Sequence, residues 1–358
     1  MITFLSEKDA EILRQVETET PPQEEVLSRI VIMNKQNRRA FLQTSAAALA
    51  GSLGPGRAVV LDGATPGAHS FFLDHRLASQ TVASNDGKKP LRLGLIIGIG
   101  KDPEAAMARV HDLGLPTCQV FVDEFEPEQV GRLRLALEKY GIEATSLVVG
   151  GPGKEVWDFY QGPLTIGLVP PETRAARILH IKKASDFAKL CGIPAVQTHC
   201  GFIPETPNDQ SYKETVMAIR EVAAYCKRNG QNLRYETGQE TPITLLRAIQ
   251  DVGVDNQGVN FDVANLILYG KANPVDALEL LGPYVQGIHA KDGLWPTNPR
   301  ELGEEVPIGK GKVDFPRIIA RLKELDYRGA VTIEREISGP QQMADVRAAK
   351  LFLEKLIG

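Results

Sequence analysis

Four polar residues stand at the ends of successive apolar segments in the C-terminal part of the chain. They are Glu236, Asp262, His289 and Glu334, and nearly equal intervals separate the first three. Three carboxylates and an imidazole that meet in one place repel one another and lose hydration unless a cation lies between them. We therefore predict one divalent metal ion bound by these four side chains. Oxygen ligands with one nitrogen favour Mn²⁺ and are also compatible with Mg²⁺, Co²⁺ or Zn²⁺.

Each of the four residues also has an ordinary structural interpretation when it is taken alone. A carboxylate at a strand end can cap a helix or pair with a basic side chain, and a histidine can be a hydrogen-bonded core residue. The shared position of all four at the ends of apolar segments favours the metal site. The longer interval before Glu334 predicts an extra loop over residues 291–312.

Residues 91–358 repeat one pattern, a short apolar or β-branched run followed by a longer amphipathic segment. The predicted strands are 91–98, 117–123, 143–149, 195–200, 232–236, 257–262, 285–289 and 330–334. The predicted helices are 102–113, 126–140, 171–190, 211–229, 241–252, 274–281, 315–325 and 340–356. Eight strand–helix units in one α/β domain indicate a (β/α)₈ TIM barrel, whose functional residues lie at the C-terminal ends of the strands.

An open doubly wound sheet is the competing fold. Gly98-Ile99-Gly100 follows the first predicted strand, and Asp123 ends the second, as in a dinucleotide-binding unit. The fingerprint requires a third glycine, however, and Pro103 occupies that position. The glycine pair is therefore weak support, and the barrel remains the predicted fold.

Residues 1–90 are predicted to be a signal and linker rather than part of the barrel. Arg38-Arg39 precedes an apolar run over 45–53 that is too short to span a bilayer, a pattern that resembles a twin-arginine export signal. We expect the twin-arginine machinery to export the protein to the periplasm without a stable membrane anchor. If this segment is only a helix end and linker, the location is cytoplasmic. We also expect a cleavage region and linker over 58–90, with 71–77 packed on the domain, and hypothesise a start at Met33.

The composition excludes several classes of protein. Apolar residues make up 43% and charged residues 24%, which argues against disorder and against a helical membrane bundle. With 41 Lys and Arg against 45 Asp and Glu, the net charge of −4 gives no electrostatic support for nucleic-acid binding. The four cysteines are too scattered for a disulfide framework or a zinc site and are expected to be small buried residues. The number of subunits stays open, and a homo-oligomer is compatible with the sequence.

Four strings of the sequence resemble the xylose-isomerase-like barrels, the sugar phosphate isomerases and epimerases, over residues 91–358. They are Asn260-Phe261-Asp262-Val263-Ala264-Asn265, His289-Ala290-Lys291-Asp292-Gly293, the run 307–315, and Thr332-Ile333-Glu334-Arg335-Glu336. The resemblance implies a metal bound by the four residues singled out above. It also implies that the two glutamates act as the acid and base of an epimerase.

The chain departs from this family at three places. Asn265 stands where epimerases and the related apurinic-site endonucleases have a histidine, so a metal ligand is lost while a hydrogen-bond donor remains. Pro242 stands where epimerases have a substrate-binding glutamate. Residues 301–305 lack the Asp-x-His of the endonucleases, which argues against a three-metal nuclease.

The ligand set predicts carbohydrate chemistry. A sugar or keto-sugar that chelates the ion becomes acidic beside its carbonyl, and Glu236 and Glu334 would remove and return the proton through an enediolate. We expect a metal-dependent isomerase or epimerase. A lyase or dehydratase acting on an inosose, keto-sugar or keto-glycoside is the alternative, and a non-catalytic carbohydrate-binding barrel is a second one. Because sugar phosphates are scarce outside the inner membrane, we expect an unphosphorylated ligand.

Five further residues are predicted to contact the substrate: His199, Asn265, Lys291, Trp157 and Trp295. His199 can instead be a buried structural histidine, Lys291 can simply pair with Asp292, and either tryptophan can anchor a loop. Strand alternation predicts that Arg335 faces away from the bore and that Glu336 returns to it.

Overall fold

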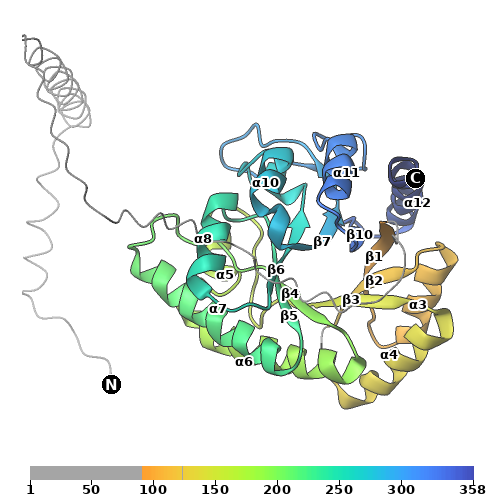
Figure 1. Cartoon of the computed structure of the whole chain (residues 1–358), viewed down its shortest axis with the longest axis horizontal. Coiled ribbons are helices and arrows are strands. Elements are labelled where there is room, and N and C mark those ends of the chain that lie inside the picture. The colour runs from red at the N-terminus through yellow and green to blue at the C-terminus, as the bar shows by residue number, and fades with distance from the viewer. Residues whose placement is uncertain (1–90, 123) are drawn as a thin grey trace, which may run out of the picture. The chain divides into compact units, whose positions relative to one another are not determined.

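The computed structural model describes residues 91–122 and 124–358, and the predicted signal, start site, linker and packed segment lie outside this part. Eight of the described strands form a closed parallel barrel (Figure 1). They are β1 (Arg92–Gly98), β2 (Thr117–Phe121), β3 (Glu143–Val148), β4 (Ala195–Thr198), β5 (Asn232–Glu236), β6 (Gln257–Asp262), β7 (Val285–Ala290) and β10 (Ala330–Ile333). Neighbours in sequence pair in this order, and β10 pairs with β1 to close the barrel.

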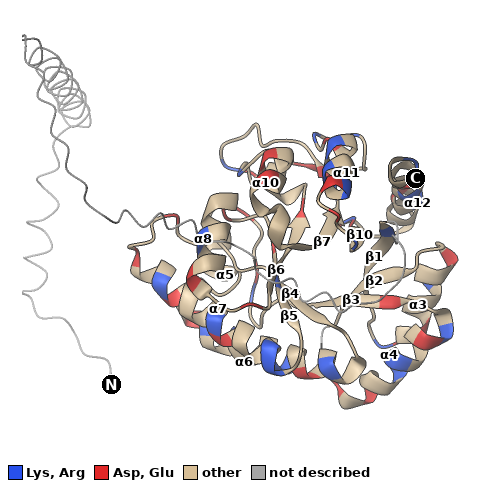
Figure 2. Cartoon of the chain, in the orientation of Figure 1, with Lys and Arg blue, Asp and Glu red and all other residues tan. Residues whose placement is uncertain are grey.

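Helices cover the outside of the barrel. They are α3 (Pro103–Asp112), α4 (Pro127–Tyr140), α6 (Pro171–Cys191), α7 (Gln210–Arg228), α8 (Pro242–Val252), α10 (Pro274–Leu281), α11 (Phe315–Glu324) and α12 (Pro340–Ile357). Most begin with a proline in the first turn, where its missing N–H costs nothing. Lysine, arginine, aspartate and glutamate residues are distributed along these outer helices (Figure 2). The TIM barrel prediction is confirmed, and the doubly wound alternative is wrong because the sheet closes.

Several short elements were not predicted, and all lie in connections between barrel strands. They are α5 (Gly162–Thr165), α9 (Asn265–Leu268), the 3₁₀ turn η1 (Gly282–Tyr284) and the antiparallel pair β8 (Asp292–Gly293) and β9 (Glu305–Val306). Elements of two to four residues are too short to carry a hydrophobic period. The pair β8–β9 lies within the extra loop that was predicted for residues 291–312.

The core lies between the barrel and its helices, and it contains all four cysteines. Each cysteine is buried with a free thiol, which confirms their prediction as small core residues. Inward-facing positions of the strands carry polar side chains as well, including Gln119, Gln197 and Asn260. Among the described residues, no helix has both the length and the apolar character needed to cross a membrane.

Candidate metal centre

The four predicted ligands meet at the C-terminal rim of the barrel. Glu236 and Asp262 are the last residues of β5 and β6, His289 is in β7, and Glu334 follows β10 directly. Strand register holds them level, because Asp262 lies opposite His289 and His289 lies opposite Thr332. One ligand atom from each of the four lies within 4.8 Å of the others. The side chains that sequence analysis selected are therefore brought together.

The imidazole of His289 presents its Nδ1 atom to the carboxylates. This nitrogen is 3.0 Å from Glu334 Oε2, 3.1 Å from Glu236 Oε1 and 3.5 Å from Asp262 Oδ2. The other ring nitrogen, Nε2, lies 2.7 Å from Gln119 Oε1. An amide oxygen accepts only, so Gln119 favours a proton on Nε2 and leaves Nδ1 free to act as a ligand.

Buried amide side chains contact the acidic cluster and orient its members. Gln119 is itself fixed, because its Nε2 donates to Asn260 Oδ1 at 2.9 Å. Gln197 donates through Nε2 to Glu236 Oε2 at 3.0 Å and accepts from Ser146 Oγ at 3.1 Å. Sequence analysis missed Gln119 and Gln197. Each is a glutamine within an otherwise apolar strand. Its role in the site can be recognised only once the strand register is known.

The charges of the cluster are strongly coupled. Burial raises the pKa of Asp262 to about 7, although Lys291 opposes this effect. Burial also raises the pKa of Glu334, but Lys291 and His289 outweigh it and hold that pKa well below its usual range. For Glu236, His199 and His289 likewise outweigh burial and lower the pKa. The cluster thus holds two ionised glutamates beside an aspartate that titrates near neutrality.

The donor set fits a divalent ion. Asp262 Oδ2 and Glu334 Oε2 are buried, and neither accepts a hydrogen bond from any described residue. Buried carboxylate oxygens that accept no hydrogen bond are costly, and a cation between them reduces that cost. Asp262 is further oriented through its other oxygen, which accepts from the backbone N–H groups of Ala264 and Asn265 at 2.8 and 2.7 Å.

Lys291 and Asn265, which are predicted to contact the substrate, lie beside this cluster. Lys291 is 1% exposed, and its Nζ is 3.4 Å from Glu334 Oε2 and 2.8 Å from Glu336 Oε1. It also donates to Asn265 Oδ1 at 3.2 Å. The alternative pairing of Lys291 with Asp292 is wrong, because Asp292 accepts four backbone N–H groups instead.

His199 and Trp157 form the side of the site near β4. His199 Nε2 lies 3.5 Å from Glu236 Oε2, and the indole of Trp157 meets the imidazole edge-on at 4.9 Å. Trp157 is 46% exposed, in keeping with a surface that ligands can reach. Trp295 is also exposed in the loop between β8 and β9, but no described contact joins it to the four candidate ligands.

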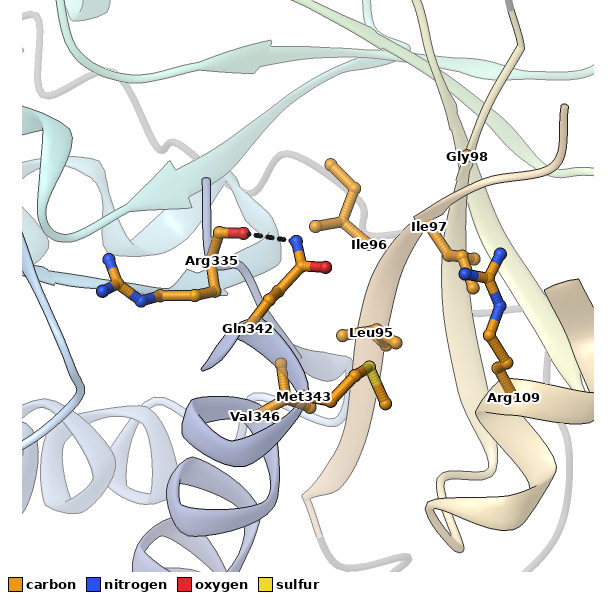
Figure 3. A pocket seen from close by; sticks show the side chains of 9 residues that line it. All are labelled: Leu95, Ile96, Ile97, Gly98, Arg109, Arg335, Gln342, Met343 and Val346. Carbon is orange, nitrogen blue, oxygen red and sulfur yellow. Dashed lines mark hydrogen bonds between the residues drawn. The ribbon is translucent and has the colours of Figure 1, made fainter. Parts of the chain in front are cut away.

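Arg335 turns away from the bore, as strand alternation predicts. Its Nε donates to Asp345 Oδ2 of α12 at 2.8 Å, and its carbonyl accepts from Gln342. Figure 3 shows Arg335 and Gln342 beside a hollow of about 190 Å³ between β1, α3 and α12. Glu336 has an exposed side chain that reaches Lys291 from the rim.

A closed (β/α)₈ barrel with an acidic and imidazole cluster at its mouth defines a class of barrel proteins with a candidate divalent-ion site. The chain belongs to the xylose isomerase-like TIM barrel family, whose model matches residues 107–356. A xylose isomerase domain protein from Planctomyces limnophilus is similar in structure, with 36% identity, a TM-score of 0.69, and coverage of 75% of this chain and 97% of that one.

More distant structures share the fold. A D-psicose 3-epimerase, crystallised in the presence of D-fructose, has 19% identity and a TM-score of 0.57 over 75% of this chain and all (100%) of its own. A probable 3-DHS dehydratase from Bacillus anthracis has 16% identity and a TM-score of 0.55 over 74% and 99%. The uncharacterized protein MJ1311 of Methanocaldococcus jannaschii is 31% identical over 169 residues. That match covers 44% of this chain and 55% of the relative.

Proposed function

We propose that the protein is a divalent-metal-dependent isomerase or epimerase of an unphosphorylated sugar or keto-sugar. The observation that carries this proposal is the convergence of Glu236 and Glu334 on His289 Nδ1, together with the buried oxygens Asp262 Oδ2 and Glu334 Oε2, which accept no hydrogen bond from the described residues. Glu236, Asp262, His289 and Glu334 would hold the ion, with Mn²⁺ the first choice. When bound, a divalent ion polarises a sugar carbonyl and makes the neighbouring C–H group more acidic.

The two glutamates are suited to moving a proton. Both have lowered pKa values, so each is ionised and able to accept one. They come from β5 and β10, which β6 and β7 separate in the barrel, so they address a bound sugar from different sides. One removes the proton, and the other, once it has taken up a proton from water, returns it. Return to the same carbon gives an epimer, whereas return to the adjacent carbon gives an isomer.

The remaining side chains would bind and orient the sugar. Lys291 places an ammonium group beside Glu334, where it would stabilise negative charge that develops on a substrate oxygen. Asn265 and His199 offer hydrogen bonds near Glu236. Trp157 offers an exposed aromatic face beside His199, and Trp295 offers another on the rim.

Elimination is the second candidate reaction. Lys291 lies 3.4 Å from Glu334 Oε2, so a proton donor stands beside a base. If the substrate carries a leaving group next to the acidic carbon, this pair would support its loss, as in a lyase or dehydratase. A carbohydrate-binding barrel without chemistry is the third alternative.

Hydrogen exchange in D₂O distinguishes these functions. The protein loaded with Mn²⁺ is incubated with keto- and aldo-sugars, and the recovered sugars are analysed by NMR and mass spectrometry. Deuterium beside the carbonyl supports an isomerase or epimerase, and release of water or a glycosyl group supports the lyase. Glu334→Gln should abolish either reaction, whereas Glu354→Gln on the outer helix α12 should not. Metal-loaded protein that exchanges no sugar proton would contradict the proposal.

We also propose that residues 1–90 are an export signal and linker, 91–358 being the barrel domain, and that the twin-arginine machinery carries the protein to the periplasm. The support is the Arg38-Arg39 pair before a short apolar run. N-terminal sequencing of the protein purified from its host, compared with an Arg38→Lys/Arg39→Lys variant, tests this. A mature protein that still contains residues upstream of Arg38 would contradict export.

A further inference from the structure

Aromatic side chains from three connections meet at the rim of the barrel beside the candidate metal site. Trp157 and Phe159 lie between β3 and α6, Phe202 follows β4, and Tyr269 follows α9. The ring centroid of Tyr269 is 6.4 Å from that of Phe159 and 5.8 Å from that of Phe202, and both contacts are edge-on. We call these four residues the aromatic wall.

One imidazole ring separates the indole of Trp157 from the candidate ligands. Trp157 meets His199 edge-on with ring centroids 4.9 Å apart, and His199 Nε2 lies 3.5 Å from Glu236 Oε2. The candidate ligands are buried, whereas Trp157 is 46% exposed. A sugar ring bound at the ion would therefore lie on the inner side of His199, and a ring stacked on Trp157 would lie farther out, towards solvent.

We propose that the aromatic wall binds the second ring of a glycoside, and that Trp157 is the residue that stacks on it. The substrate is then a two-ring sugar, of which one ring reacts at the ion, rather than a free monosaccharide. This inference rests on the proposed function, because it names the substrate class of the same site. The faces of a pyranose ring consist of C–H groups that pack against an aromatic ring, while the hydroxyl groups at its edge stay in water.

Polar contacts hold the backbone of the connection between β3 and α6. Arg177 of α6 is 1% exposed and donates to two carbonyl oxygens of this connection at 2.5 and 2.8 Å. Asp158 Oδ1 accepts from the backbone N–H groups of residues 160–162 at 2.5 to 3.3 Å. Trp157 therefore belongs to a pre-formed surface, and binding a ring against it requires little additional ordering.

Three large apolar side chains of this connection remain exposed, although polar contacts hold its backbone. They are Trp157, Tyr160 and Leu164, with exposed fractions of 46, 59 and 64%. A single exposed apolar residue on an outer helix, such as Leu351 on α12, is ordinary. Three in one connection beside a buried polar site instead indicate a surface that a ligand covers.

The first experiment measures binding and does not depend on turnover. Trp157 and Trp295 are the two tryptophans of the sequence, so Trp295→Phe leaves Trp157 as the only indole. This full-length variant with Mg²⁺ is titrated with fructose and with turanose, maltulose and isomaltulose, which carry glucose on different oxygen atoms of fructose. We expect at least one two-ring sugar to shift or quench the Trp157 emission and fructose to leave it nearly unchanged. An emission that responds equally to fructose, or to none of the two-ring sugars, would overturn the proposal.

The second experiment assigns the effect to the aromatic face of Trp157. Stacking on an aromatic ring contributes about 3- to 10-fold in affinity. In titration calorimetry, Trp157→Leu should weaken the best-bound two-ring sugar by that factor and leave fructose unaffected, whereas Trp157→Phe should retain most of the affinity. Leu351→Ala, exposed on α12, is the control and should bind both sugars like the wild type. Equal weakening of fructose and the two-ring sugar in Trp157→Leu would contradict a second-ring site.

Binding and turnover separate the failure of this inference from the failure of the proposed function. If two-ring sugars bind at Trp157 but exchange no hydrogen in D₂O, the proposed reaction is wrong and the second-ring site stands. If sugars exchange hydrogen and Trp157→Leu leaves every binding constant unchanged, the reaction stands and the aromatic wall does not bind a second ring.

Discussion

At the scale of single residues, neutral amides carry much of the orientation that the charged ligands need. His289 has its proton-bearing nitrogen 2.7 Å from Gln119 Oε1, and Gln119 is held by Asn260. Glu236 receives a hydrogen bond from Gln197. A neutral partner fixes direction without adding charge to a cluster that already holds three carboxylates. The candidate ligands are therefore mostly charged, whereas the side chains that orient them are neutral amides.

This arrangement predicts that Gln119→Met weakens metal binding. The variant keeps the length of the side chain but removes the oxygen that orients His289, and we expect the affinity for Mn²⁺ to fall about 10- to 100-fold. Titration calorimetry on metal-stripped protein measures the change. Gln129→Met on the outer helix α4 is the control and should bind like the wild type. Unchanged affinity in the Gln119 variant would show that the imidazole is oriented by other contacts.

A second prediction concerns Glu240, a buried carboxyl with no assigned role in the reaction. Its Oε2 has no hydrogen-bond partner among the described residues, and burial raises its pKa from 4.5 to about 8. The unfolded chain ionises this group near pH 4.5, so between these values the folded protein binds more protons than the unfolded chain. The free energy of unfolding should therefore fall as the pH rises through this window and level off above it.

Glu240→Gln removes this dependence. Relative to the wild type, the variant should gain stability progressively from pH 5 to pH 8, by at most about 1.4 kcal/mol for each pH unit. Urea unfolding at several pH values measures the difference, with Glu354→Gln as an exposed control. If the wild-type and Glu240→Gln curves run parallel from pH 5 to pH 8, the carboxyl is ionised throughout and the prediction is wrong.

The candidate ligands could be predicted from sequence, whereas their support could not. Glu236, Asp262, His289 and Glu334 each interrupt an apolar pattern at its end, where a polar residue is conspicuous. Gln119 and Gln197 lie within predicted strands, and their value depends on inward orientation and on partners far away in sequence. Local patterns do not report such long-range pairs.

At the scale of elements, one carboxylate organises the segment that leads from the mouth to α11. Asp292 accepts backbone N–H groups from Gly293, Gly309, Gly311 and Val313 at 2.9 to 3.1 Å. The approach requires glycine, because a Cβ at Gly311 would lie 2.0 Å from Asp292 Oδ1. The segment 307–313 is thus tied to β8, which follows Lys291 directly.

Asp292→Asn should loosen this segment. The new amide keeps one acceptor oxygen but presents donors to two of the N–H groups, so we expect a loss of about 2–5 kcal/mol. Hydrogen exchange should rise at Gly309, Gly311 and Val313 while exchange in β5 and β6 stays slow. Asp314→Asn, at the N-cap of α11, is the matched control because asparagine caps helices equally well. Unchanged hydrogen-exchange protection at Gly309, Gly311 and Val313 would show that Asp292 does not hold this segment.

Element boundaries were predictable where the chain carries explicit signals. Proline in the first turn and glycine after the last turn mark both ends of α6 and α8, and the predicted ranges differ from the observed ones by about one residue. The pair β8–β9 was missed because two residues provide no alternation to read. It forms through contacts that Asp292 and its loop create, so it depends on tertiary structure.

At the scale of the whole molecule, the candidate ligands all come from one half of the barrel. Glu236, Asp262, His289 and Glu334 come from β5, β6, β7 and β10, which are adjacent in the closed sheet. The repeated strand–helix pattern predicted this closure, since eight such units at this length leave few other folds. A cation shared by four neighbouring strands would oppose their separation and so stabilise the fold as well as the site.

Metal binding should therefore raise the unfolding temperature of the full chain. At Mn²⁺ about 100 times above its dissociation constant, a ligand of the folded state adds about 2.7 kcal/mol. For a domain of this size, that corresponds to roughly 5–10 °C in Tm. Calorimetry with and without a chelator measures the shift, with a monovalent salt at equal ionic strength as the control.

Asp262→Asn makes this test specific to the cluster. Asparagine keeps an oxygen for the backbone N–H groups of Ala264 and Asn265, and it removes a carboxyl whose pKa burial raises to about 7. Above that pH, the variant without metal should unfold at the same temperature as the wild type without metal, or higher, because it no longer buries that negative charge. It should also lose most of the increase that Mn²⁺ gives. An equal increase in the variant would place the stabilising ion elsewhere on the molecule.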